Sequence, residues 1–172
     1  LKIVFSFIEN STTPLVLDAD ALNCVAKQPE ILLRKKAPII ITPHPGEMSR
    51  LTGLATPLVN AERERVALDF AQKYGVVTVL KGAGTVIASP NGKVLVNPTG
   101  NSGMATGGSG DVLAGMTASI LAQGASAFSS AAAAVYLHGL AGDIAAEKYG
   151  KISMLPTDLI NCIPLAYKRC GF

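Results

Sequence analysis

Short apolar runs alternate along the chain with longer segments in which apolar residues recur at helical spacing. The runs at residues 14–18, 37–42 and 76–80 are almost wholly apolar, which predicts strands that are buried on both faces. Residues 86–89 and 93–97 flank the turn signal Pro90-Asn91-Gly92 and are predicted to form an antiparallel hairpin.

Helical periodicity accounts for most of the remaining sequence. Residues 1–9 fit either a helix or a strand, and Gly75 is expected to end the helix before it as a C-cap. Thr157 or Ser153 is expected to cap the last helix. Helical turns or short helices are predicted over residues 21–27 and 29–36, and a helix is expected to start over 47–51. Longer helices are predicted over residues 59–74, 111–123, 126–149 and 156–168.

This alternation of strands and helices predicts a single α/β domain. The sheet is expected to be mainly parallel with helices on both faces, and the hairpin near residues 86–97 extends it. With 172 residues, 49% of them apolar, the chain can bury one core. The uncharged stretch 125–142 consists mostly of Ala, Ser and Gly, so it predicts a tightly packed helix rather than a membrane span.

Composition narrows the possible partners and the compartment. A net charge of +3 without any Trp does not favour nucleic-acid binding. Cys24, Cys162 and Cys170 are odd in number and widely spaced, which fits neither a disulfide framework nor a zinc site. The start of the chain has no signal-peptide pattern, so a reducing cytoplasm is the expected location.

The candidate chemistry gathers where the predicted strands end. Asp18 and Asp20 follow the first strand, His44 and Glu47 follow the second, and residues 81–85 follow the third. In open α/β sheets, ligands bind beyond the carboxyl ends of the strands. We therefore expect these side chains at one edge of the sheet. The alternative for the first pair is structural: Asp20 would cap the helix that follows, and Asp18 would fix the turn at the end of the strand.

The glycine-rich run at residues 101–111 (NSGMATGGSGD) opens a predicted helix. Glycines let successive backbone N–H groups converge on an anion, and the helix adds the positive end of its dipole. Asp111 would repel a phosphate unless it takes part in the chemistry or holds a metal, which favours phosphoryl transfer. The alternative is a turn with Asp as a helix cap. The run is neither a P-loop nor a Rossmann fingerprint.

Four segments in this order resemble the bacterial NAD(P)H-hydrate dehydratases, a branch of the ribokinase-like family. They are VLDADALN at 16–23, ITPHPGE at 41–47, KGAGT at 81–85, and the run 101–111. The resemblance implies a three-layer ribokinase-like fold. It also implies an enzyme in which a nucleotide phosphorylates the hydroxyl of hydrated NAD(P)H, and loss of phosphate regenerates NADH or NADPH. AMP and phosphate are the expected by-products.

The resemblance also implies roles for individual residues. Asp111 would be the catalytic base and would contact the hydrated cofactor, with His44 and Asn23 as further substrate-binding residues. Glu47 would help place magnesium through water, with a helix-dipole partner as the alternative. His138 has no such role and is expected to be a buried core histidine. The nucleotide would bind Lys81, Gly82, Ala83, Gly84, Thr85 and Gly110, and the anion hole would comprise Gly107, Gly108, Ser109 and Gly110.

The expected cofactor is Mg²⁺, with ADP, or else ATP, as phosphoryl donor, because the PHPGE and KGAGT segments look bacterial. Small nucleotides are the expected partners, without nucleic acid or membrane. A homo-oligomer is expected, and an epimerase domain is possible as a fusion or a separate protein.

Members of this family normally carry about another hundred residues before the VLDAD strand, a size consistent with several more α/β units. Residues 1–172 are therefore expected to be the C-terminal portion of a larger domain. Two other functions stay open: a ribokinase-like kinase of a vitamin-precursor alcohol of the hydroxymethylpyrimidine, thiazole or pyridoxal type, and a non-catalytic nucleotide-binding module.

Overall fold

A five-stranded sheet forms the centre of the molecule in the computed structural model, which describes residues 2–172. The strands lie in chain order, the first three parallel and the last two added as an antiparallel hairpin, as predicted. The strands are β1 (Leu15–Leu17), β2 (Ile39–Ile41), β3 (Val77–Leu80), β4 (Val86–Ala88) and β5 (Val94–Val96).

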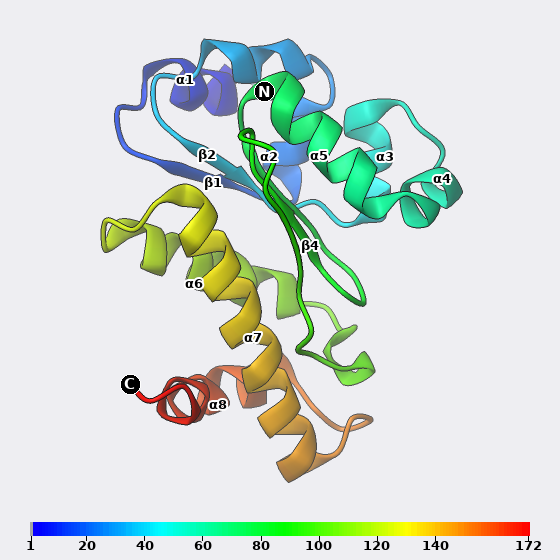
Figure 1. Cartoon of the computed structure of the whole chain (residues 1–172), viewed down its shortest axis with the longest axis vertical. Coiled ribbons are helices and arrows are strands. Elements are labelled where there is room, and N and C mark those ends of the chain that lie inside the picture. The colour runs from blue at the N-terminus through cyan, green and yellow to red at the C-terminus, as the bar shows by residue number, and fades with distance from the viewer. Residues whose placement is uncertain (1) are drawn as a thin grey trace.

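Helices cover both faces of this sheet (Figure 1). The upper layer of Figure 1 contains α1 (Lys2–Asn10), α2 (Asp20–Val25), the 3₁₀ segment η1 (Pro29–Arg34), α3 (Pro45–Thr52), α4 (Thr56–Ala61) and α5 (Arg63–Tyr74). The lower layer contains α6 (Ser109–Ala122), α7 (Ala127–Tyr149) and α8 (Pro156–Arg169), and a short 3₁₀ turn η2 (Ser102–Met104) precedes α6.

The alternation of side chains along β2 explains why both faces are covered. Ile39 and Ile41 pack into the upper core, whereas Ile40 packs into the lower core, and all three are at most 1% exposed. Each such buried side chain contributes about 1.5–3 kcal/mol. The sheet is therefore stable only as the middle of three layers, which confirms the predicted α/β class.

The prediction of one continuous helix over residues 59–74 is wrong. The structure has two helices, α4 and α5, because Glu62 leaves the helical conformation with φ −127° and ψ 43°. Two other helices begin earlier than predicted: α3 at Pro45 and α6 at Ser109. Residues 2–10 are helical, which settles the open choice there for all but Leu1, which lies outside the described residues.

The helix ends show which side chains satisfy free backbone groups. Gly75 ends α5 with φ 63°, as predicted. At the start of α8, the N-cap is Leu155, and Asp158 accepts a hydrogen bond from its N–H at 2.9 Å. The expected caps are therefore wrong, and the Ser153 hydroxyl instead donates to the carbonyl of Tyr149.

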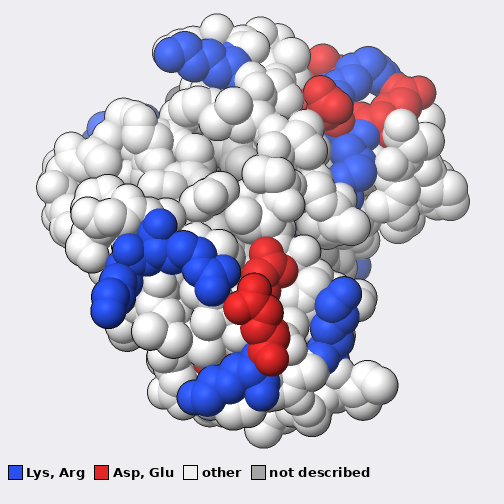
Figure 2. Space-filling view, turned by 60° about the horizontal axis from the view of Figure 1, so that its bottom comes forward, with Lys and Arg blue, Asp and Glu red and all other residues white. Residues whose placement is uncertain are grey.

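The predicted packing of residues 125–142 is confirmed, since α7 buries a stripe of small residues against the sheet and α6. No helix within residues 2–172 is long and apolar enough to cross a membrane. The three cysteines are free. On the face shown in Figure 2, basic side chains lie in separate groups with acidic ones between them, not in a continuous basic surface.

Candidate active site

A cavity of about 940 Å³ lies at the carboxyl ends of the parallel strands. Its walls are the loops after β1, β2 and β3, a strap of residues 97–104 that follows β5, and the start of α6. The structure thus brings together nearly every residue that the sequence singles out. The predicted site residues in the wall are His44, Lys81, Gly82, Ala83, Gly84, Thr85, Gly107, Gly108, Ser109, Gly110 and Asp111.

The glycine run forms the N-terminal end of α6. Gly108 is the N-cap and has φ 96°, a backbone conformation that side chains rarely permit. A Cβ on Gly110 would lie 3.5 Å from the Nζ of Lys81. The helix N-terminus and a lysine ammonium therefore face the same space, which is the arrangement that binds phosphate.

Lys81 is held by two carboxylates, one from the loop after β1 and one from the first turn of α3. Its Nζ lies 2.7 Å from Oδ1 of Asp18 and 3.8 Å from Oε2 of Glu47. The side chains of Lys81 and Asp18 are only 19% and 13% exposed, so this ion pair is much less screened than a surface pair. The residue after Asp18, Ala19, is the single non-glycine in residues 2–172 with positive φ, at 47°.

His44 and Glu47 together cap α3. Nδ1 of His44 accepts the N–H of Gly46 at 3.0 Å, and Oε2 of Glu47 accepts the N–H of His44 at 2.8 Å. This capping box explains why Glu47 is only 6% exposed, and it supports the structural alternative for that residue. Within residues 2–172, no three His, Cys, Asp or Glu side chains form a metal-binding group, so the magnesium role of Glu47 stays a prediction.

His138 of α7 lies in the cavity wall behind the glycine run. Its Nε2 lies 2.9 Å from the carbonyl oxygen of Ser109, the first residue of α6. The pKa of His138 is lowered to about 4, chiefly by burial; the hydrogen bond with the Ser109 carbonyl opposes this shift, and the charge of Lys81 adds to it. The ring is therefore neutral, and its N–H is the donor to Ser109. The prediction of a buried histidine is confirmed.

Asp111 and Asn23 differ in their placement. Asp111 is exposed on the cavity wall, where a ligand hydroxyl can reach its carboxylate. Asn23 is not a wall residue; it is exposed on α2, where its Oδ1 accepts from Nε of Arg50 at 3.0 Å. The structure therefore does not bring Asn23 to the cavity, and its substrate role stays a prediction.

Sequence reasoning missed the contacts that hold the strap. Asp143 of α7 accepts the N–H of Gly100 at 2.9 Å and the amide Nδ2 of Asn101 at 3.0 Å. The strap also packs so closely on α7 that a Cβ on Gly139 would lie 2.1 Å from Oγ1 of Thr99. A glycine inside an otherwise Ala-rich helix was the available signal for such a close approach.

The fold, together with the place of the cavity at the carboxyl ends of the strands, indicates the class of protein. A solved structure of a ribokinase-like superfamily protein from Enterococcus faecalis superimposes with a TM-score of 0.82 at 31% sequence identity. The match covers 98% of this chain and 57% of the E. faecalis chain. The chain thus has the ribokinase-like α/β fold.

The chain belongs to the NAD(P)H-hydrate dehydratase family, whose model matches residues 1–165. A bifunctional NAD(P)H-hydrate repair enzyme from Moorella thermoacetica is 44% identical over 98% of this chain and 32% of its own length. The ADP/ATP-dependent NAD(P)H-hydrate dehydratase from Bacillus subtilis, co-crystallised with ATP and Mg²⁺, superimposes with a TM-score of 0.85 at 36% identity. That match covers 94% of this chain and 57% of the B. subtilis chain. The chain therefore spans about a third to little more than half of these relatives.

Proposed function

We propose that the protein takes part in nucleotide-dependent dehydration of hydrated NAD(P)H. The observation that carries this proposal is the meeting of Lys81, the N-terminus of α6 and Asp111 in one cavity. Family membership supports the substrate, and the names of the relatives support the nucleotide. The result would be repair of a damaged redox cofactor.

In the proposed reaction, the carboxylate of Asp111 takes the proton from the hydroxyl of the hydrated nicotinamide ring. That hydroxyl attacks the terminal phosphorus of ADP, and the bond to the AMP oxygen breaks. Backbone N–H groups of residues 107–110 and the ammonium of Lys81 stabilise the charge on the transferred group. Elimination of phosphate, together with a proton from the neighbouring ring carbon, then gives NAD(P)H, so the overall products are NAD(P)H, AMP, phosphate and a proton.

The carboxylates around the cavity fit a magnesium ion that arrives with the nucleotide. Mg²⁺ is usually held by one or two carboxylates together with substrate phosphates, so a preformed cage of protein ligands is not required. Asp111 and Asp18 are the wall carboxylates available to it. When bound, the ion would neutralise phosphate charge during transfer.

The reaction is tested by incubating the protein with hydrated NADH or NADPH, Mg²⁺ and either ADP or ATP. Recovery of the absorbance of the reduced nicotinamide ring is expected, fastest with ADP. Vitamin-precursor alcohols with ATP serve as the comparison. No recovery with either nucleotide, or phosphorylation of an alcohol instead, contradicts the proposal.

Asp111→Asn tests the base. The amide cannot accept the hydroxyl proton as a base, so we expect kcat to fall about 100- to 10,000-fold. The affinity for ADP, measured by calorimetry, should change little because the backbone N–H groups remain. A variant with unimpaired turnover would show that another group is the base.

The length of the chain within its relatives supports a further proposal, that residues 1–172 are the C-terminal portion of a larger domain. The intact mass of the purified protein, compared with its encoded open reading frame, tests this. A homo-oligomer and an accompanying epimerase stay predictions.

A further inference from the structure

The loop between β3 and β4, residues 81–85, has a guanidinium group behind it. Nη2 of Arg63 donates to the carbonyl of Leu80 at 2.8 Å and lies 3.5 Å from that of Gly84. One side chain therefore joins the two ends of the loop. Arg63 is not in the cavity wall, whereas residues 81–85 are, so the guanidinium supports the loop from the side away from the ligand space.

The middle of the loop is shaped to this side chain. A Cβ on Gly82 would lie 2.7 Å from Nη1 and 3.0 Å from Nη2 of Arg63, and Gly82 has φ 147°. Glycine at this position thus permits both the backbone conformation and the close approach of the guanidinium. Loop and arginine form one packed unit.

The position of Arg63 is electrostatically unfavourable for its charged side chain. It is the first residue of α5, where a positive charge opposes the helix dipole. Burial lowers its pKa, and its Nε is buried without a hydrogen-bond partner among residues 2–172. The break at Glu62, which separates α4 from α5, directly precedes this residue. Unfavourable local choices of this kind are typical of residues that serve a site.

We propose that Arg63 is a positioning residue that holds the 81–85 loop in the conformation that receives the nucleotide phosphates. This inference rests on the proposed function, because it assigns the loop to nucleotide binding. Arg63 itself does not touch the ligand and acts through the carbonyls of Leu80 and Gly84.

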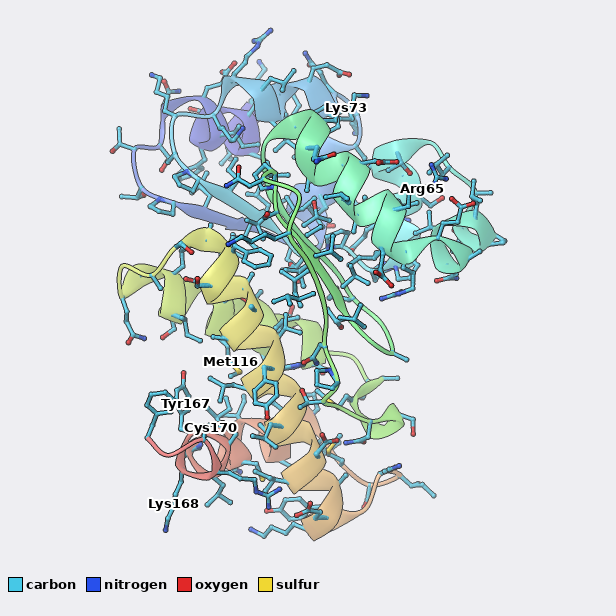
Figure 3. The ribbon with its side chains drawn as sticks, viewed as in Figure 1. Arg65, Lys73, Met116, Tyr167, Lys168 and Cys170 are labelled. Carbon is cyan, nitrogen blue, oxygen red and sulfur yellow. The ribbon has the colours of Figure 1, made fainter. Side chains whose placement is uncertain are left out.

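The test uses Arg63→Ala, Arg63→Lys and Arg65→Ala. Arg65, labelled in Figure 3, is the matched control, because it lies two residues further along α5 and, within residues 2–172, forms its ion pairs with Glu62 and Asp69. We expect Arg63→Ala to weaken ADP binding about ten-fold or more, since small misplacements of binding groups are costly, with a smaller effect on kcat. Arg63→Lys should restore part of the affinity, and Arg65→Ala should bind as the unaltered chain does.

Amide hydrogen exchange without nucleotide gives an independent readout and shows whether each variant folds. Exchange of the Lys81 amide, which donates to the Pro43 carbonyl at 2.8 Å, should accelerate in Arg63→Ala but not in Arg65→Ala, while the core strands stay protected. Unchanged loop exchange, or unchanged ADP affinity in Arg63→Ala, overturns the inference. Failure of the unaltered chain to bind ADP contradicts the proposed nucleotide site instead, so the two failures are distinguishable.

Coupling between Arg63 and Gly82 separates a loop-specific role from general destabilisation. Gly82→Ala places a methyl group against the guanidinium, so its effect on ADP affinity should be larger in the Arg63 background than in Arg63→Ala. The backbone strain at φ 147° is common to both backgrounds and cancels in the comparison. Additive effects would show that Arg63 does not act through the loop.

Discussion

Lys81 shows what a single residue gains from its neighbours in the sheet. β1 and β3 lie on either side of β2, yet the long side chain of Lys81 reaches the Asp18 carboxylate at the end of β1. The family resemblance predicts this lysine as a nucleotide-binding residue, but it does not predict this ion pair. The ion pair with Asp18 fixes the direction of the Lys81 side chain before a ligand arrives. An incoming phosphate must therefore share the ammonium with the Asp18 carboxylate.

His138 makes stability depend on pH. Above pH 6.5 the ring is neutral in both the folded and the unfolded chain; between pH 6.5 and the folded pKa of about 4, only the unfolded chain binds the proton. As the pH falls through this window, the free energy of unfolding should therefore decrease by up to about 3 kcal/mol. Urea unfolding at several pH values measures it.

His138→Gln is the control for that pH dependence. The amide retains an N–H donor for the Ser109 carbonyl and does not titrate, so this part of the slope should disappear. An identical pH profile in the variant would assign the slope to other groups.

At the scale of elements, the sequence predicted strands and helices better than their ends. The three buried strands and the hairpin were found because apolar runs and an Asn-Gly turn are local signals. The break at Glu62 was missed because no glycine or proline marks it within residues 59–74. The start of α6 at Ser109 was missed because Gly108 begins the helix in a left-handed conformation rather than through a side-chain cap.

Two glycine-to-alanine changes, one in the close contact between α7 and the strap and one at an open position of α6, should have opposite effects on stability. Gly139→Ala should lower the free energy of unfolding by about 1–3 kcal/mol through overpacking against Thr99, despite the better helix propensity of alanine. Gly115→Ala in α6, where a Cβ would meet nothing within 4 Å, should raise it by up to about 1 kcal/mol. Denaturant melts of both variants measure the difference; equal effects would contradict the packing described.

For the whole molecule, the cavity is assembled from both layers around the sheet. Its walls combine loops that lead to the upper helices with the start of α6 in the lower layer. Motif order and the rule for parallel sheets were enough to predict this meeting place. The strap contacts and Arg63 were missed, because both join segments that are distant in sequence, and the one local signal, Gly139 in an Ala-rich helix, does not say which segment approaches it.

A ligand that contacts both layers should stabilise the fold as a whole. At an ADP concentration 100 times Kd, the free energy of unfolding should rise by about 2.7 kcal/mol. Thermal melts with and without ADP measure this. Asp111→Asn should show the same increase, whereas an increase seen equally with inorganic phosphate alone would show that the adenosine part makes no contact.

The ion pair of Lys81 has a consequence for how a nucleotide arrives. Among the described residues of the cavity wall, two carboxylates, Asp18 and Asp111, oppose one ammonium, and His138 is neutral. The charged side chains of the wall therefore give no net attraction for anions, and capture at the wall depends on short-range backbone N–H groups. Raising the ionic strength should leave the association rate of ADP unchanged or increase it, unlike the steep fall seen for ligands steered by a basic surface.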